Sequence, residues 1–242
     1  MSLPLCEIRR LGLVPYTAAW EMQNQIAGEI ARGESPPTLL LLEHPHTYTI
    51  GRRGRPENLL WDTAELDLRQ VEVHWVDRGG DVTYHGPGQL VGYPLLPLDT
   101  AGLDSHQGRI PQADYVGYLR RLERVLIAAL DKLDVKATCQ EGLTGIWVDS
   151  PAGGGKLAKI AAIGVKVDAH GVTRHGFALN LNPDMSYWQG IIACGLHNQP
   201  VTSLAEILNP PPDMNQVIQW VIWAFGNEFQ YDMIETDSLT NR

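Results

Sequence analysis

Apolar and polar residues alternate along the chain in a pattern that predicts both strands and helices. The run TLLLLEH at 38–44 predicts a buried strand, because short apolar runs are typical of a sheet interior, and TYTIGRR follows it. VEVHWVDRGG predicts another strand that runs into glycines. Further strands are expected at 6–13, 145–149, 159–167 and 175–182, the second and third of these joined by the glycine-rich tip SPAGGGK.

Three segments carry apolar residues at helical spacing, which predicts amphipathic helices. These segments are 15–33, 114–133 and 214–229. Gly33 lies near the expected end of the first one. The expected apolar stripes are Trp20, Ile26, Ala27 and Ile30 in the first, Tyr115, Leu119, Leu122, Leu126, Ala129 and Leu133 in the second, and Met214, Val217, Val221 and Phe225 in the third.

The order of these elements predicts one α/β domain of the α+β type with a mixed sheet, spanning residues 1–242. The strands at 146–148, 159–167 and 176–181 follow one another without a helix between them, which favours antiparallel pairing. There is no internal repeat, and the prolines at 210–212 are too few to separate domains. The polar, acidic tail from Tyr231 is expected to be frayed.

The composition is that of a globular protein. Of its 242 residues, 44% are hydrophobic and 19% are charged, and no apolar run reaches the roughly 18 residues of a membrane span. The start MSLPLCEIRR has neither a signal-peptide core nor transit-peptide character. Cys6, Cys139 and Cys194 are an odd number and lie far apart, so they predict no disulfide framework. We therefore expect a cytoplasmic protein with no membrane partner.

The formal net charge of −9 argues against a nucleic-acid partner, since nucleic-acid binding relies on many phosphate contacts from Lys and Arg. Basic residues nevertheless gather at Arg52, Arg53 and Arg55. Such a patch either receives an acidic partner or is solvated surface, and the sequence leaves both interpretations open.

The stretch RGGDVTYHGPGQL at 78–90 is rich in glycine and also carries Arg78, Tyr84 and His85. Glycine lets a ligand approach the backbone closely, and successive amide N–H groups can form an anion- or carbonyl-binding concavity. A surface turn needs fewer such residues, so we interpret this stretch as a ligand-binding loop.

Two other patterns carry no chemistry. GGGK at 153–156 lacks the glycine and the Ser or Thr that a phosphate-binding loop needs around its Gly-Lys pair, because Ser150 and Leu157 stand there. The histidines are scattered and show no metal-ligand spacing, so no metal site is expected.

Lys159 and Cys194 each allow two interpretations. Strict alternation puts Lys159 on one strand face with Ala161 and Ile163, where it is either an edge lysine that reaches water or an ammonium in a pocket. Cys194, in IIACGLHNQPVTSL, lies on an expected turn and is either filler or a nucleophile. A thiol of pKa about 8.5 is only a few per cent thiolate at pH 7, so a nucleophilic Cys194 needs a nearby cation, for which Lys159 is the candidate.

Four motifs in order resemble those of the lipoyl(octanoyl) transferases, and together they are far more specific than one glycine loop. They are RGGDVTYHGPGQLVGYPLL, KIAAIGVKV, HGFALNLNPD and ACGLHNQPVTSL, and the resemblance covers roughly residues 35–208. Members of that family are octanoyl-acyl-carrier-protein:protein N-octanoyltransferases of lipoate biosynthesis. The resemblance implies a single acyltransferase catalytic domain with the biotin/lipoate-protein-ligase-like fold.

The resemblance also implies roles for individual residues. Cys194 would be the nucleophile that carries the acyl thioester. Lys159 would activate Cys194, and His175 would help to orient the site. The residues implied for the acyl pocket are Arg78, Gly79, Gly80, Asp81, Val82, Thr83, Tyr84 and His85, with Ala162, Ile163, Gly164, Gly176, Phe177 and Ala178 on two neighbouring strands.

The implied reaction needs no cofactor, ATP or metal, because the octanoyl group arrives as a thioester on the phosphopantetheine of acyl carrier protein. It would pass to Cys194 and then to a lysine of a lipoyl domain, in 2-oxoacid dehydrogenase complexes or the glycine-cleavage H protein. Lys159 would be a cation for the thiolate or, once neutral, a base for the incoming amine, and the sequence does not separate these roles.

Two rival functions stay open at this stage. An ATP-dependent lipoate–protein ligase of the same fold forms an acyl-adenylate and has no use for a cysteine nucleophile, so Cys194 disfavours it. A non-catalytic acyl- or protein-binding module would keep the pocket, but the presence of both Lys159 and Cys194 speaks against it.

Overall fold

The computed structural model describes residues 2–98, 114–151, 154–193 and 199–236. In these ranges the main feature is an eight-stranded sheet with the order β11-β1-β2-β6-β10-β9-β8-β7. β11, β1 and β2 are parallel to one another, and each later neighbour is antiparallel, so the expected mixed sheet is confirmed. Its strands are β1 (Leu5–Leu13), β2 (Thr38–Glu43), β6 (Gln89–Leu95), β7 (Ala137–Thr138), β8 (Ile146–Asp149), β9 (Leu157–Val167), β10 (Thr173–Asn180) and β11 (Asp232–Glu235).

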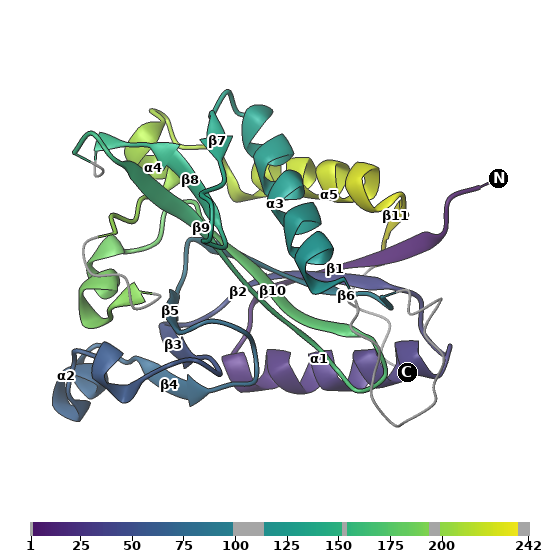
Figure 1. Ribbon diagram of the computed structural model, residues 1–242, viewed down its shortest axis with the longest axis horizontal. Helices are drawn as coiled ribbons and strands as arrows, with labels where there is room; N and C mark the ends of the chain where they lie inside the picture. The colour runs from purple at the N-terminus through teal and green to yellow at the C-terminus, as the bar shows by residue number, and fades with distance from the viewer. Residues whose placement is uncertain (1, 99–113, 152–153, 194–198, 237–242) are drawn as a thin grey trace.

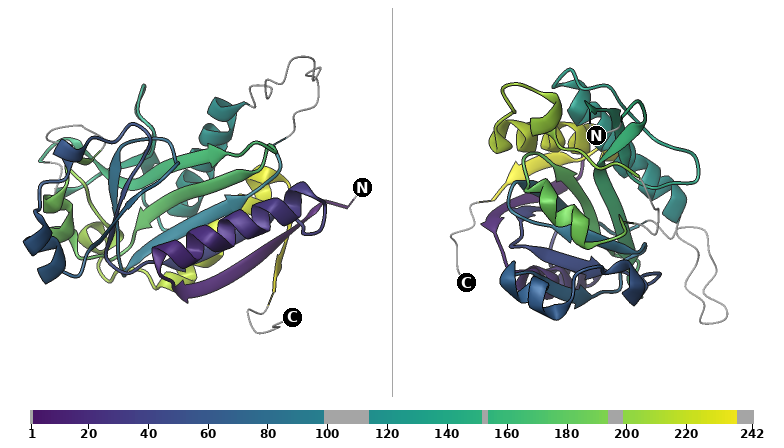
Figure 2. Two further views of the ribbon diagram at one scale, coloured as in Figure 1. Left: turned by 90° about the horizontal axis from the view of Figure 1, so that it is seen from below. Right: turned by 90° about the vertical axis from the view of Figure 1, so that its left-hand side faces the viewer.

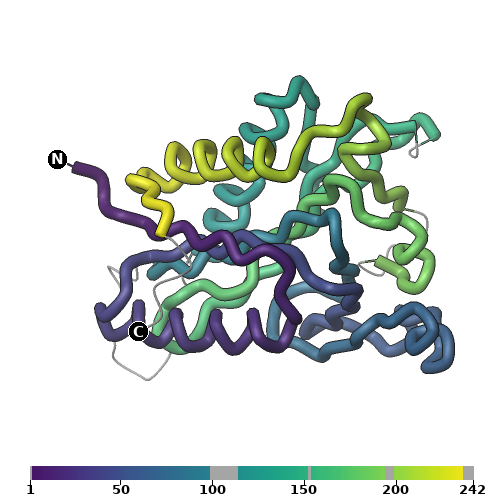
Figure 3. The backbone as a smooth tube through the Cα atoms, turned by 180° about the vertical axis from the view of Figure 1, so that it is seen from behind, coloured from purple at the N-terminus to yellow at the C-terminus, as the bar shows by residue number. Residues whose placement is uncertain are grey.

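Helices cover both faces of this sheet (Figure 1). α3 (Tyr115–Asp131) and α5 (Met214–Phe229) lie on one face, and α1 (Tyr16–Ala31) lies on the other, which the view from behind also shows (Figure 3). Leu39 and Leu41 pack with α3 and α5, whereas Leu40 and Leu42 pack with α1. The apolar run of β2 therefore has no polar alternation, because both of its faces are buried.

The stripe predicted for the second helix is only partly confirmed. Leu122, Leu126 and Ala129 are buried, but Tyr115 is 37% exposed and the core also takes Tyr118 and Leu130. α3 begins where the Asp114 side chain accepts a hydrogen bond from the backbone N–H of Gly117 at 2.7 Å. Such N-cap bonds satisfy an amide that has no partner inside the helix.

A second, three-stranded sheet, β4 (Glu72–Trp75), β3 (Thr47–Ile50) and β5 (Val82–His85), lies at one end of the molecule (Figure 2). Four short helices complete the described chain: η1 (Pro56–Asn58), α2 (Thr63–Leu68), η3 (Met185–Gly190) and α4 (Leu204–Ile207). The interpretation of RGGDVTYHGPGQL as one loop is wrong, because it contains β5 and the start of β6. The loop proper is 78–81, and β5 and β6 belong to different sheets.

The expectation of a frayed tail from Tyr231 is wrong for residues 232–235. These residues form β11, which pairs in parallel with β1 from Leu5↔Asp232 to Ile8↔Glu235. The N–H of Asp232 also donates to the carbonyl of Pro4 at 2.9 Å. A polar edge strand resembles a tail in sequence, because only its backbone is bound to the sheet.

Candidate active site

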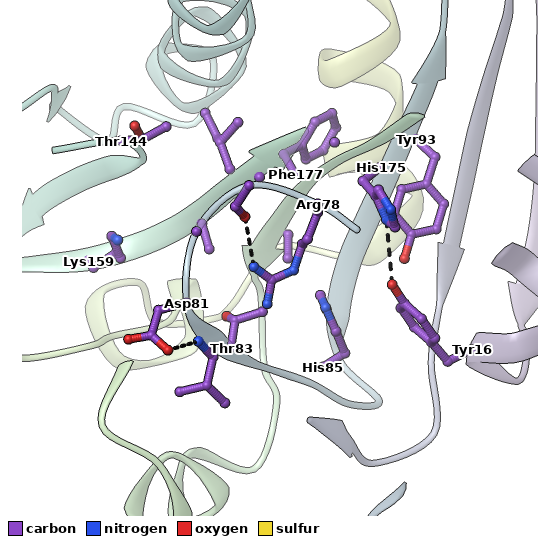
Figure 4. A pocket seen from close by; sticks show the side chains of 18 residues that line it. Tyr16, Arg78, Asp81, Thr83, His85, Tyr93, Thr144, Lys159, His175 and Phe177 are labelled. Carbon is purple, nitrogen blue, oxygen red and sulfur yellow. Dashed lines mark hydrogen bonds between the residues drawn. The ribbon is translucent and has the colours of Figure 1, made fainter. Parts of the chain in front are cut away.

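A pocket, called the inner pocket below, lies between the loop 78–81, β5 and the neighbouring strands β9 and β10 (Figure 4). Most of the residues implied by the resemblance do line it: Arg78, Gly79, Gly80, Asp81, Val82, Thr83, His85, Lys159, Ala162, Ile163, Gly164, His175, Gly176, Phe177 and Ala178. These positions come from three separate segments, so the sheet topology brings the first three motifs together at one place.

Tyr84 is the exception and is not among the residues that line the inner pocket. Its ring stacks on Tyr187 with centroids 5.3 Å apart, and its hydroxyl hydrogen-bonds His46 Nδ1 at 2.9 Å. Successive side chains of a strand point to opposite faces, so Tyr84 lies opposite the pocket-lining Thr83 and His85. The implied role of Tyr84 as a pocket residue does not agree with this position.

Tyr16, Tyr93 and Thr144 line the inner pocket but were missed in the sequence. Tyr16 starts α1, far along the chain from the glycine motifs, whereas Tyr93 is on β6 within the motif RGGDVTYHGPGQLVGYPLL itself. In Figure 4, Thr144 and Lys159 lie at one end of the pocket and Tyr16 and Tyr93 at the other. No local pattern marks Tyr16, because only the packing of α1 against β6 and β10 brings it to the pocket.

Arg78 fixes the loop 78–81 to the second sheet. Its side chain is 7% exposed and its Nη2 donates to the Thr49 carbonyl at 2.6 Å and to the Thr49 hydroxyl at 2.9 Å. Nη1 donates to the Gly79 carbonyl at 3.0 Å, and the Gly79 N–H donates to the Val165 carbonyl at 2.9 Å. The loop is thus tied both to β3 and to β9, on either side of the pocket.

The histidines around the pocket are held neutral by burial. Desolvation places the pKa of His85 well below its usual range and also lowers the pKa of His175, because a buried imidazolium loses its hydration. His175 donates from Nε2 to Asp77 at 2.8 Å, and this bond holds the pKa of the Asp77 carboxyl well below its usual range. Neutral rings next to Phe177 and Ala178 make a wall that suits an uncharged chain.

Lys159 is 6% exposed, and its Nζ lies 4.9 Å from the ring centroid of Trp147 on β8. A cation over an aromatic face is attracted by the negative charge of the ring face. Gly145 lies close to the same side chain, because a Cβ at Gly145 would be 2.9 Å from Lys159 Cε. The ammonium therefore lies in the pocket, and the interpretation of Lys159 as an edge lysine that reaches water is excluded.

β9 does not keep the strict alternation that the sequence suggested. Its pairing with β8 shifts between Ile146↔Ala161 and Trp147↔Lys159, which leaves Ile160 as one extra residue on β9. Ile160 and Ala161 both belong to the core cluster, whereas Lys159 and Ala162 line the pocket. A β-bulge re-aims the side chains that follow it, so the expectation that Lys159 and Ala161 share a face is wrong.

Cys194 lies outside the described residues, but both of its described flanks are attached near the pocket. On one side, the Ile192 N–H donates to the Asn58 carbonyl at 2.8 Å. On the other side, the Lys159 N–H donates to the Pro200 carbonyl at 2.8 Å, and the Thr202 N–H donates to the Lys159 carbonyl at 3.0 Å. The chain therefore returns to the backbone of Lys159 six residues after Cys194.

A wider cavity of about 680 Å³, called the outer cavity below, shares Lys159, Gly79 and Gly80 with the inner pocket. Arg53 and Arg55 also line it, as do Tyr115 and Leu119 of α3. The inner pocket and the outer cavity therefore adjoin at Lys159 and the loop 78–81.

The comparison with protein families identifies the chain. Residues 15–226 match the model of the lipoyl protein ligase A/B catalytic domain. The chain belongs to this family. It is 45% identical over 222 residues to an octanoyltransferase of Chloroflexus aurantiacus, covering 92% of this chain and 93% of that protein. It is 45% identical over 219 residues to an octanoyltransferase of Syntrophotalea carbinolica, covering 90% and 92%.

The fold also agrees with solved structures. A bi-partite lipoate protein ligase from Thermoplasma acidophilum superposes with a TM-score of 0.72 at 15% identity, covering 98% of this chain and 87% of that one. The family resemblance and the lipoate-protein-ligase-like fold that it implied are both confirmed. At this identity the structural likeness shows the fold alone.

The other candidate chemistries find no support in the described ranges. Within them no group of three or more His, Cys, Asp or Glu is placed to hold a metal ion. Burial raises the pKa of Cys6 to about 12 and also raises the pKa of Cys139, so neither thiol is a ready nucleophile. No helix of the described chain is both long enough and apolar enough to span a bilayer.

Proposed function

We propose that this chain is an octanoyltransferase of lipoate biosynthesis, which takes the octanoyl group from octanoyl-acyl carrier protein and transfers it to a lysine of lipoyl domains. The observation that carries the proposal is the 45% identity to octanoyltransferases over 92% of the chain. The acceptors are the lipoyl domains of 2-oxoacid dehydrogenase complexes and the glycine-cleavage H protein, in the cytoplasm, where a free thiol stays reduced.

Cys194 is the nucleophile and Lys159 its activating partner. The buried ammonium of Lys159 favours the thiolate form of Cys194. Lowering the pKa of this thiol by about two units requires that the thiolate be stabilised relative to the thiol by roughly 2.7 kcal/mol. The attachment of Pro200 and Thr202 to the backbone of Lys159 supports this pairing, since it ties the motif of Cys194 to the lysine. Backbone N–H groups of the glycine loop 78–81 are our candidates for the oxyanion donors.

The reaction proceeds in two balanced steps. The Cys194 thiolate attacks the carbonyl carbon of the donor thioester and forms a new C–S bond to it. The C–S bond between this carbon and the pantetheine sulfur breaks, and the pantetheine thiolate leaves and takes up a proton. The lysine amine of the lipoyl domain then attacks the acyl-enzyme, forms the amide, loses a proton and releases the Cys194 thiolate. No ATP, metal or other cofactor takes part, because the donor is already activated.

The inner pocket holds the octanoyl chain. Burying each CH₂ contributes about 0.8 kcal/mol, so an eight-carbon chain can be bound by this effect alone. Neutral His85 and His175, with Phe177, Ala162 and Ala178, support this assignment, because none of these groups places a charge against the chain.

The experiment is intact-mass analysis after mixing with octanoyl-acyl carrier protein. We expect one octanoyl adduct on Cys194, which apo lipoyl domain removes. Cys194→Ala should abolish the adduct, whereas Cys139→Ala, the control for a partly exposed thiol, should keep it. Transfer by Cys194→Ala at the normal rate would refute the thioester mechanism, and a requirement for ATP would favour the ligase alternative.

Lys159→Ala should slow acylation and raise the pKa of the Cys194 thiol. The control is Lys156→Ala, because Lys156 is exposed and three residues away on the same segment. Iodoacetamide labelling of Cys194 as a function of pH measures the thiol pKa directly. An unchanged labelling profile in Lys159→Ala would rule out the ion-pair role of the lysine.

A further inference from the structure

The turn at residues 51–55, called the arginine turn below, carries Arg52, Arg53 and Arg55, all of them exposed. Arg53 and Arg55 line the outer cavity, and Lys159 lines the same cavity. Positive charge is therefore concentrated beside a cavity that adjoins the inner pocket, on a protein whose formal net charge is −9.

The backbone of the arginine turn is fixed to the pocket loop 78–81. The Arg52 N–H donates to the Arg78 carbonyl at 3.0 Å, and the Arg53 N–H donates to the Gly80 carbonyl at 3.1 Å. Gly51 permits this close approach, since a Cβ there would lie 2.5 Å from the Gly80 carbonyl oxygen. The three arginines thus start from a rigid base next to the pocket.

The side chains of the arginine turn differ from the other arginines in their partners. Within the described ranges, every other arginine side chain forms an ion pair with a carboxylate or donates to a backbone carbonyl. For Arg52, Arg53 and Arg55 the same ranges provide no such partner. Asp81 lines the same cavity as Arg53 and Arg55, but its carboxylate accepts hydrogen bonds from Asn58 Nδ2 at 2.5 Å and from the Val82 N–H at 2.7 Å and not from these arginines.

We propose that the arginine turn is the docking site for the carrier protein of the acyl donor, where it binds the phosphodiester of the pantetheine arm and acidic groups around it. This inference rests on the octanoyl transfer proposed above. The donor thioester hangs on an arm whose attachment to the carrier is a phosphodiester, and this anion must come close to the cavity when the thioester enters it. Guanidinium groups match phosphate oxygens in geometry and charge.

The test compares two donors with the same thioester. Octanoyl-acyl carrier protein carries the phosphodiester and the protein surface, whereas octanoyl-pantetheine carries neither. In the variant Arg52→Ala/Arg53→Ala/Arg55→Ala we expect the KM for the carrier donor to rise about 10-fold or more with kcat unchanged, since steering by charge changes encounter rates by 10–10³. The kinetics with octanoyl-pantetheine should stay the same.

The matched control removes three positive charges elsewhere. It is Arg9→Ala/Arg32→Ala/Lys136→Ala, which alters groups in ion pairs away from the outer cavity. This variant has the same net charge as the first and should keep the normal KM for both donors. Added salt should raise the KM for the carrier donor in the normal protein and in this control, but not in the arginine-turn variant.

Binding of the carrier protein is measured separately by fluorescence anisotropy. An unchanged KM for the carrier donor and unchanged binding of the carrier protein in the arginine-turn variant would overturn the docking site. An equal rise of the KM for octanoyl-pantetheine would also overturn it, and so would a rise of the KM for the lipoyl domain alone. If the normal protein binds the carrier through the arginine turn but transfers no octanoyl group from either donor, then the proposed function fails while the docking site stands.

Discussion

Gly145 lies just before β8 with a backbone φ of +132°, where Lys159 passes over it. A Cβ at this position would be 2.9 Å from Lys159 Cε and 2.6 Å from the Ala161 carbonyl oxygen. Glycine adopts such a φ at little cost, and here it also leaves space for the lysine side chain. We infer that Gly145 positions Lys159 without touching the substrate.

The substitution Gly145→Ala should therefore displace the Lys159 ammonium and lower the rate of octanoyl transfer by about 10²-fold, since a misplacement of about 1 Å can cost that much. The thiol pKa of Cys194, followed by iodoacetamide labelling against pH, should rise. The control is Gly142→Ala, because Gly142 also has a positive φ, +75°, but a Cβ there would meet nothing within 4 Å. Equal effects of the two substitutions would mean that backbone strain, not lysine position, is responsible.

At the scale of elements, β11 shows how a polar segment becomes part of the sheet. It supplies the parallel neighbour that covers the outer edge of β1. Met233, on this strand, packs against the main core cluster together with Tyr231. The sequence around them is acidic and short of apolar residues, so the strand is held mainly by hydrogen bonds from the backbone of β1.

Removal of β11 should destabilise the whole domain. A chain that ends at Tyr231 should show a lower Tm and a lower free energy of unfolding than the 242-residue chain, because β1 loses a hydrogen-bonded neighbour. A chain that ends at Thr236, which keeps β11, is the control and should retain the normal Tm. Thermal unfolding followed by circular dichroism compares the three chains, and an equal Tm for all of them would show that β11 contributes nothing.

At the scale of the whole molecule, three buried histidines lie where the sheets and α1 meet. Burial lowers the pKa of His44 to about 4 and lowers those of His85 and His175 as well. His44 donates from Nδ1 to the Val14 carbonyl at 2.7 Å, so its Nε2 accepts from the Tyr93 hydroxyl at 2.8 Å. This arrangement is possible only for the neutral ring.

The free energy of unfolding should therefore fall as the pH decreases from about 6.5 to 4. In that window the unfolded chain binds protons at these histidines and the folded protein does not, so acid favours unfolding. His44 alone accounts for about 3 kcal/mol over this range, at roughly 1.4 kcal/mol per unit of pKa. Asp77 acts in a different window, since its depressed pKa stabilises the fold above pH about 4 and this contribution is lost only at lower pH.

Urea unfolding at a series of pH values between 7.5 and 4.5 measures this dependence. His44→Gln should make the dependence on pH shallower, whereas His170→Gln, which alters an exposed histidine, should leave it unchanged. The same slope in all three proteins would show that His44 does not titrate with a lowered pKa.

The sequence by itself determined most of the elements, the class of fold and the family. The apolar runs, the helical spacing and the four ordered motifs are local patterns, and each depends on residues close together in the chain. The three long helices and the strands β2, β8, β9 and β10 were therefore predicted, whereas β5 and β6 were not, as far as the described residues extend. Most of the residues implied for the acyl pocket do lie together around one pocket, and their role in binding stays a prediction.

Only the tertiary structure decided what depends on contacts between distant segments. It brought Tyr16 and Tyr93 to the pocket, turned Tyr84 away from it, inserted Ile160 as an extra residue on β9 and paired the acidic tail with β1. Local alternation could not show these features, because a bulge or an edge pairing is set by the partner strand. The role of Cys194 stays a prediction from the sequence, which the attachment of Pro200 to Lys159 supports.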